Sequence, residues 1–397
     1  VSDIASVCSR LLATDPYALT ANKEILKHQV EKFDRRAKNH PLVVAIYGSQ
    51  NNEVLKTATL HALTRYFPDQ TIRVDCKEYG QHREIFFGQQ SERYDCVICV
   101  ERFSHLKRAG NFGDQIKQED LAKYISEIKE ISGRLSKSVV VLTFSRLEVS
   151  QWGGYFEPSE RETACLTVAQ ANQLLSVELT KEEGIVLVDI DTISGLGVSQ
   201  TDSRLEFLAR TPFSEQFSSL IASCVAGRLL ARFGKSIRLL LVDLDNTLWG
   251  GVAGEDGPNG IQVGPDFPGN IFVALQRRLK SLANRGIALG IVSKNDEWTV
   301  KEIFRLHSGL PLTYQDFVAT RINWESKVEN IRSIAQEVGL SLATIGFLDD
   351  NPVEREEVAQ MLPEVKVLPW EDDFADMPSM LDTNPYLAPW KITGEDQ

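Results

Sequence analysis

The stretch that decides the fold is Leu239-Leu-Leu-Val-Asp-Leu-Asp-Asn-Thr-Leu-Trp-Gly-Gly251, in which an apolar run ends abruptly in acidic residues. A short aliphatic run bounded in this way is typical of a buried strand in a parallel sheet. Because the functional groups of such sheets lie beyond the carboxyl ends of the strands, we expect Asp243 and Asp245 to emerge there. Two aspartates spaced by two residues leave the strand on the same side and approach one metal ion or substrate. One carboxylate is then placed to attack phosphorus while the other transfers a proton.

Polar residues also follow a second apolar run, Ile287–Val292, where the chain continues Ser293-Lys-Asn295. The hydroxyl of the serine and the amide of the asparagine suit phosphate oxygens. Farther along, the segment Arg321–Lys327 is predicted to open a helix, and the ammonium group of Lys327 suits a phosphate group. The sequence therefore predicts phosphate-binding side chains near the acids.

A third apolar run, Thr344–Leu348, ends in Asp349-Asp-Asn-Pro352. The proline suits the first position of a helix, so the strand stops where the acids begin. Arg355, in the helix that follows, is expected to orient the two acids. Carboxylates at two strand ends form an oxygen-rich shell, which suits a hard octahedral ion such as Mg²⁺ rather than zinc. The sequence therefore predicts magnesium as the cofactor.

This ordered set of an Asp-x-Asp-x-Thr motif, a serine, a lysine and an Asp-Asp pair resembles the four motifs of the haloacid dehalogenase-like phosphatase superfamily. The resemblance implies that Asp243 is the nucleophile that becomes an aspartyl phosphate. It implies that Asp245 is the general acid and base, and that its backbone carbonyl contacts Mg²⁺. The expected metal ligands are Asp243, Asp245, Asp349 and Asp350. The expected phosphate- and substrate-binding residues are Thr247, Ser293, Lys294, Asn295, Arg321 and Lys327, although an ion pair with surface acids is equally compatible with Arg321.

A closer resemblance, to the FkbH-like family of polyketide pathways, covers residues 237–370 almost continuously. It is carried by Asp243–Gly257, Ser293–Asp296, Arg321–Trp324 and Phe347–Arg355. It implies use of 1,3-bisphosphoglycerate, removal of phosphate, and delivery of the glyceryl unit to the phosphopantetheine thiol of an acyl carrier protein. An acyl phosphate is already activated, so thioester formation needs positioning and charge neutralisation more than a further energy source.

One residue departs from the family pattern, which places a cysteine immediately before the motif-two serine as the thiol that receives glycerate. This sequence has Val292 there, and valine cannot form a thioester. Three functions therefore stay open: glyceryl transfer to a carrier protein, Mg²⁺-dependent hydrolysis of a small phosphate ester without acyl transfer, and non-catalytic binding of a carrier protein. Complete phosphatase motifs argue against the last, because a scaffold has no evident need for two carboxylate-bearing strand ends.

Strand and helix patterns also alternate between Pro41 and about residue 235. Near-continuous apolar strands separated by helices predict a second parallel sheet that is covered on both faces. The predicted strands are Leu42–Tyr47, Thr71–Cys76, Cys96–Val100, Val139–Phe144 and Ile185–Ile190. This part resembles, more weakly, the SGNH-hydrolase-like domain that precedes the catalytic domain in the FkbH-like family.

Ser49 follows the first of these strands, where the SGNH fold places its nucleophile. Its activation requires a histidine, usually from a late loop, that is oriented by a carboxylate. No histidine occurs between His105 and His307. An approach of His82 or His105 to Ser49 stays open, but neither lies in the expected register. The domain is therefore predicted to be a degenerate hydrolase fold that docks a carrier protein or shapes the active site.

The predicted fold class is α/β, with two three-layer domains. We expect an N-terminal helical segment at residues 1–40 and a flavodoxin- or SGNH-like domain at residues 41–235. A haloacid dehalogenase-like Rossmannoid domain follows at residues 236–376, with a small flap within Trp249–Asn270, and a C-terminal tail at residues 377–397.

The composition of the 397-residue chain excludes several other classes of protein. A hydrophobic content of 43% with 25% charged residues rules out a disordered or fibrous chain. The formal net charge of −12 and the lack of a basic run disfavour nucleic-acid binding. No apolar segment approaches the ~18 residues that span a bilayer, and the six cysteines form no dense framework, so a cytoplasmic protein is expected. Cys96 and Cys99 are predicted to be buried strand residues on opposite faces rather than a zinc pair.

Overall fold

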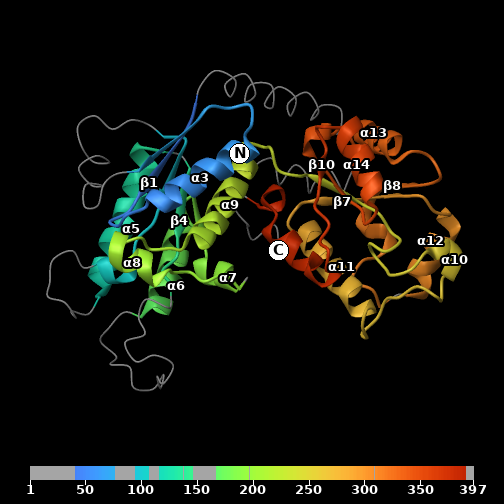
Figure 1. The fold of residues 1–397 in the computed structure, drawn as a ribbon, viewed down its shortest axis with the longest axis horizontal. Coiled ribbons are helices and arrows are strands. Elements are labelled where there is room, and N and C mark those ends of the chain that lie inside the picture. The colour runs from blue at the N-terminus through green and yellow to red at the C-terminus, as the bar shows by residue number, and fades with distance from the viewer. Residues whose placement is uncertain are drawn as a thin grey trace. The chain divides into compact units, whose positions relative to one another are not determined.

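The computed structural model describes residues 41–76, 94–106, 116–136, 138–145, 167–195, 197–307 and 309–389 (Figure 1). The chain divides into two compact units, one within residues 34–226 and the other from residue 227 onward. The division falls inside one helix, α9 (Glu215–Arg232). The helical segment predicted at residues 1–40 lies outside the described residues. None of the helices in the ranges above combines the length and the apolar composition that crossing a bilayer requires.

The first unit is built on a five-stranded parallel sheet of order β2-β1-β3-β4-β5. Its strands are β1 (Leu42–Tyr47), β2 (Ile72–Cys76), β3 (Cys96–Cys99), β4 (Val139–Leu142) and β5 (Ile185–Val188). Its helices are α3 (Glu53–Tyr66), α5 (Gln118–Arg134), α6 (Val168–Leu179), α7 (Ile190–Ser194) and α8 (Ser203–Ala209), with the 3₁₀-helix η1 (Phe103–His105). The strand order reverses between β1 and β3, and in sheets of this kind ligands bind beyond the carboxyl ends of the strands at that point.

Alternate side chains of this sheet pack beneath α5 and α6. Ala45 and Tyr47 of β1 lie in one buried cluster with Val97 and Cys99 of β3. The two helices add apolar side chains at helical spacing: Leu121, Ile125, Ile128, Ala171, Leu175 and Leu179. Because a buried face fixes strand register, the loops that follow β1 and β3 are held side by side.

The cysteines of β3 are part of this buried sheet. Cys96 and Cys99 are both fully buried, and only Cys99 belongs to the cluster beneath α5 and α6. Burial raises the pKa of each thiol well above its usual value, so neither is a ready thiolate. The prediction of buried strand residues is confirmed.

The second unit has a five-stranded parallel sheet of order β10-β9-β6-β7-β8. Its strands are β6 (Leu239–Val242), β7 (Ala288–Ser293), β8 (Phe317–Ile322), β9 (Ile345–Leu348) and β10 (Lys366–Val367). Its helices are α10 (Ala253–Asp256), α11 (Gly269–Asn284), α12 (Glu297–Leu306), α13 (Lys327–Val338), α14 (Pro352–Met361) and α15 (Met377–Thr383). Since β6 lies between β9 and β7, the residues that follow these three strands meet at one edge of the sheet.

Successive residues of β6 face opposite layers of the core. Leu239 and Leu241 pack with side chains of α13 and α14, including Ile331 and Val358. On the other face, Leu240 and Val242 pack with side chains of α11, α12 and α15, among them Leu275, Leu279, Ile303, Met377 and Leu381. Helices therefore cover both faces of the sheet, and the predicted three-layer α/β class is confirmed.

Two segments of this unit differ from the sequence expectation. Residues Phe317–Ile322 form β8, so Arg321 lies in a strand, and helix α13 begins only at Lys327. The sequence does not predict β8 because this edge strand mixes buried and half-exposed residues and lacks a continuous apolar run. The residues after 376, predicted as a tail, include α15, which buries Met377, Met380 and Leu381 at helical spacing in the core.

Candidate active site

The first acidic loop leaves β6 directly beside the end of β9. The backbone N–H of Asp243 donates to the carbonyl of Leu348 at 2.9 Å, so the two strands stay paired as far as the acids. The chain then turns sharply, because the N–H of Leu248 donates back to the carbonyl of Leu244 at 2.8 Å. Asn246 takes a left-handed backbone conformation with φ 53°, which asparagine tolerates better than most residues. The turn keeps the carboxylate of Asp245 at the edge of the sheet.

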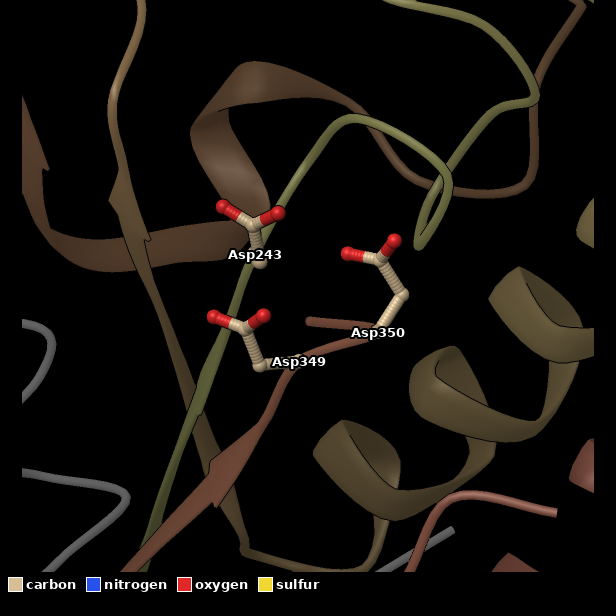
Figure 2. A group of neighbouring side chains, drawn as sticks. All are labelled: Asp243, Asp349 and Asp350. Atoms are coloured by element: carbon tan, nitrogen blue, oxygen red, sulfur yellow. The ribbon is translucent and has the colours of Figure 1, made fainter. Parts of the chain in front are cut away.

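Three carboxylates meet at this edge, those of Asp243, Asp349 and Asp350 (Figure 2). One oxygen from each lies within 4.8 Å of the others. Asp243 is only 6% exposed, Asp349 is fully buried and Asp350 is half-buried. Three negative charges this close together and shielded from water repel one another strongly, so the cluster needs positive charge.

Lys327, the first residue of α13, supplies part of that charge. Its Nζ lies 3.0 Å from Oδ1 of Asp243 and 2.5 Å from Oδ2 of Asp349. The lysine is itself buried, and the Ser326 hydroxyl caps the helix start by accepting from the backbone N–H of Val328. Burial alone would lower the pKa of the Lys327 ammonium, but the two carboxylates raise it above its usual value. The lysine therefore carries a full positive charge.

One ammonium does not balance three carboxylates, and the pKa values of the acids reflect this. Burial, with repulsion from Asp349, raises the pKa of Asp243 to about 7 against the opposing effect of Lys327. Burial and the charge of Asp349 also raise the pKa of Asp350. Further positive charge among these oxygens would favour their ionised forms.

The donor set fits Mg²⁺, because it consists of hard carboxylate oxygens at two strand ends. The adjoining cavity has a volume of about 200 Å³. The buried hydroxyl of Thr247, in the same loop, has no hydrogen-bond partner among the described residues, but Thr247 is not among the residues that line the cavity. The residues that line the cavity are Asp243, Asp245, Asn246, Ser293, Lys294, Lys327, Asp350, Asn351 and Glu354. Asp243, Asp349 and Asp350 are the side chains that would hold the ion.

Magnesium is expected to stabilise the protein against unfolding. At a concentration about 100 times its Kd, an ion that binds only the folded state adds about 2.7 kcal/mol, which raises the thermal midpoint by several degrees. In Asp350→Asn we expect a higher midpoint in EDTA, because repulsion falls, and a much smaller shift on adding Mg²⁺. Asp266→Asn, an exposed acid in the flap region, is the control and should shift as the wild type does. An equal shift in all three proteins would exclude the acidic cluster as the site.

The carboxylate of Asp245 lines the same cavity but lies outside the three-acid cluster. Its Oδ1 accepts hydrogen bonds from Nε1 of Trp249 at 2.9 Å and from the backbone N–H of Ala253 at 3.1 Å. Its Oδ2 accepts from Nδ2 of Asn295 at 2.9 Å. The amide predicted to bind phosphate thus holds the carboxylate of Asp245, and three donors fix that group beside the cavity.

We expect Trp249→Phe to lower kcat with little change in KM. The ring bulk is largely kept, but the N–H that orients Asp245 is lost. One hydrogen bond to a carboxylate contributes about 1.5 kcal/mol, which corresponds to about tenfold in rate. Steady-state kinetics on a phosphate ester measures both constants, and Trp298→Phe, at a site 70% exposed, serves as the control. An unchanged kcat would contradict a positioning role for the indole.

The other predicted side chains divide into two groups. Ser293 lines the cavity at the end of β7. Lys294 also lines it, but its Nζ is paired with Oε1 of Glu354 at 2.6 Å. The guanidinium of Arg321 instead pairs with Glu337 at 2.6 Å and is not among the residues that line the cavity. For Arg321 the structure favours the surface ion pair over a contact with substrate.

Two residues of α14 complete the site. Arg355 donates from Nη1 to the backbone carbonyls of Asp349 and Asp350, at 2.8 and 2.6 Å, and so fixes the acidic pair as predicted. Glu354 is not predicted by the sequence analysis, yet it lines the cavity and holds Lys294. The signal available in the sequence was its position in the first turn of the helix, four residues after Asp350, which returns the side chain toward the acids.

The fold and the acidic site resemble those of haloacid dehalogenase-like phosphatases. Among solved structures, the chain is similar to the N-terminal part of the protein BF1531 from Bacteroides fragilis, described as containing a phosphatase domain complexed with Mg. The two are 25% identical with a TM-score of 0.77, and the match covers 91% of this chain and 99% of that one. No family model matches the chain, and no curated protein matches it.

Two shorter matches cover less than half of the chain. One is a probable YrbI family phosphatase from Pseudomonas syringae, 15% identical with a TM-score of 0.27, over 40% of this chain and 92% of that one. The other is a hypothetical protein from Xanthomonas campestris, 18% identical with a TM-score of 0.26, over 42% and 89%.

Proposed function

We propose that this protein is a Mg²⁺-dependent phosphatase whose nucleophile is Asp243. The observation that carries the proposal is the meeting of Asp243, Asp349 and Asp350 around one point, with Lys327 in contact with two of them. Burying three acids and a lysine together is costly for folding unless they bind a charged ligand. The similarity to a structure described as a phosphatase domain with Mg supports the same assignment.

The residues have distinct tasks in this reaction. Asp243 attacks the phosphorus atom, its carboxylate oxygen forms the new P–O bond, and the substrate oxygen leaves with a proton from Asp245. Water then attacks the phosphorus of the aspartyl phosphate and gives a proton to Asp245, and the bond to Asp243 breaks to release inorganic phosphate. Lys327 stabilises negative charge on the phosphoryl oxygens throughout. A bound Mg²⁺ supplies additional neutralisation of those oxygens.

We further propose 1,3-bisphosphoglycerate as the substrate and the phosphopantetheine thiol of an acyl carrier protein as the acceptor, in the cytoplasm. This step rests on the resemblance of the motif sequences to the FkbH-like family. Lys294 and Lys327 line the cavity together with four acids, so an anionic substrate would need the additional positive charge of a bound cation. The thiol sulfur attacks the acyl carbon and the C–S bond forms. The bond from that carbon to the phosphate oxygen breaks, and inorganic phosphate leaves with the thiol proton.

The second candidate is hydrolysis of a phosphate ester without acyl transfer, and residue 292 favours it. Val292 is fully buried and packs with Leu241, Ala319 and Val328 in the apolar core. Its side chain has no nucleophilic atom. Glyceryl transfer therefore has to pass directly to the carrier thiol or through a different cysteine, and burial disfavours Cys96 and Cys99 in that role. Cys8 and Cys165 lie outside the described residues.

Mass measurement of the intact carrier separates the candidates. The protein is incubated with Mg²⁺, 1,3-bisphosphoglycerate and carrier bearing its phosphopantetheine arm, and phosphate release is measured in the same tube. A glyceryl mass increase with phosphate release supports acyl transfer. Phosphate release in excess of a no-enzyme blank, without a mass increase, supports the simple phosphatase. A protein that binds the carrier but releases no phosphate from any tested ester would refute catalysis and support the scaffold.

A further inference from the structure

A serine, a glutamate and a histidine meet in the first unit, at the carboxyl ends of β1 and β3. Oγ of Ser49 lies 3.0 Å from Nδ1 of His105, and its hydroxyl donates a hydrogen bond to Oε1 of Glu101. That carboxylate oxygen lies 3.7 Å from the same histidine nitrogen. The three groups are therefore in mutual contact, although more than fifty residues separate Ser49 from His105.

The backbone is built to bring these groups together. β1 and β3 are neighbours in the sheet, and the N–H of Val100 donates to the carbonyl of Tyr47 at 2.8 Å just before the loops begin. A Cβ on Gly48 would lie 2.0 Å from the carbonyl oxygen of Val100, so only glycine permits this approach. Ser49 follows Gly48 and Glu101 follows Val100, so their side chains are brought into contact.

The side chains in and beside this cluster differ in burial, and the buried ones carry polar atoms without hydrogen-bond partners. Glu101 is 6% exposed, and its Oε2 has no hydrogen-bond partner among the described residues. Gln50, next to the serine, is 2% exposed, and neither atom of its side-chain amide is bonded within the described part of the chain. The His105 side chain, in contrast, is 36% exposed, and Ser49 is partly exposed. Unpartnered buried polar groups are costly, and beside an accessible hydroxyl they indicate a polar ligand site.

We propose that Ser49, His105 and Glu101 form a second catalytic site, which acts on carboxylic esters. The hydroxyl of Ser49 turns from Oε1 of Glu101 to Nδ1 of His105, and Oγ attacks the acyl carbon while its proton passes to that nitrogen. The buried carboxylate of Glu101 stabilises the resulting imidazolium at 3.7 Å. The leaving alcohol takes the proton from His105, and water then releases the acid from the acyl-serine and restores the hydroxyl.

This inference does not rest on the phosphatase assignment, since its residues all belong to the first unit. It runs against the sequence expectation of a degenerate domain, which follows from the lack of a histidine in the late loops. The base comes instead from η1, four residues after Glu101 and directly beyond β3. Sheet order, which the sequence does not show, places that segment beside the loop after β1.

An alkyl fluorophosphonate probe tests the site on the full chain. Attack by Ser49 on phosphorus releases fluoride and leaves a stable adduct, which intact mass and peptide mapping locate. We expect one label per chain at Ser49, none on Ser49→Ala, and labelling at least about 100-fold slower in His105→Gln, in keeping with loss of a general base. Ser104→Ala, at an exposed serine beside the cluster, is the matched control and should label at the wild-type rate.

Hydrolysis of p-nitrophenyl acetate is measured on the same four proteins, together with their thermal midpoints. Turnover that follows the labelling pattern supports the proposal. A wild-type protein that unfolds cooperatively but takes no label would overturn it, and so would a label that persists in Ser49→Ala. Equal labelling rates for His105→Gln and wild type, at equal midpoints, would show that the serine has no histidine base and would also overturn the assignment.

Discussion

Asp243→Asn is expected to abolish phosphate release, lowering kcat by roughly 10³-fold or more. The amide cannot attack phosphorus, and it offers a neutral oxygen where the acidic cluster supplies an anionic one. The substitution also removes the partner that lies 3.0 Å from Lys327, so Mg²⁺ affinity should fall together with the rate. Phosphate release from a set of small phosphate esters, measured with excess Mg²⁺, checks the prediction.

Asp266→Asn is again the control, because it removes one exposed carboxylate from the same unit. It should keep wild-type kcat and wild-type dependence on Mg²⁺. If Asp243→Asn retained full activity, the nucleophile would have to be another residue, and the proposed phosphatase chemistry would be wrong.

Lys327→Met is expected to have the second largest effect, on activity and on stability together. The change leaves Asp243 and Asp349 buried beside each other without the ammonium that contacts both. Removing one partner from a buried ion pair costs about 3–5 kcal/mol of the free energy of unfolding. Phosphate release should fall sharply as well, because the phosphoryl oxygens lose a positive charge.

Thermal melts in EDTA and in Mg²⁺ separate the two contributions. Mg²⁺ should restore part of the lost stability of Lys327→Met, because it supplies positive charge to the same carboxylates. Lys301→Met is the matched control: Lys301 pairs with Glu297, and both side chains are 53% exposed, so its loss should cost at most about 1 kcal/mol. A Lys327→Met protein as stable and as active as the wild type would refute the buried ion pair as a working part of the site.

The sequence predicted the centre of the candidate site because parallel strands expose their ends at one edge. An apolar run followed directly by acids identifies both the strand and its carboxyl end, so Asp243 and Asp349 could be placed together without coordinates. The same reasoning placed Ser293, the last residue of β7, beside these two acids. These are local patterns whose spatial consequence follows from a general rule of sheet topology.

The sequence did not predict which side chains pair with each other, because no general rule of topology determines this. Lys294 pairs with Glu354, sixty positions away in sequence, and the amide of Asn295 turns to Asp245. Each depends on rotamers and on the distance between two loops, which a motif does not encode. Helix α15 was missed for another reason: it is only seven residues long, too short to show a clear helical period in the sequence.

The most easily overlooked feature is that α9 continues without a break through the division between the units. A fragment started at Ile237, where the apolar run begins, would lack Gly227 and Arg228. A Cβ on Gly227 would lie 2.8 Å from Cβ of Ala388, and the Arg228 guanidinium donates to the carbonyl of Pro389. Removing residues 227–236 would therefore remove contacts that the second unit makes within itself. A fragment meant to fold as the second unit should therefore start before Gly227.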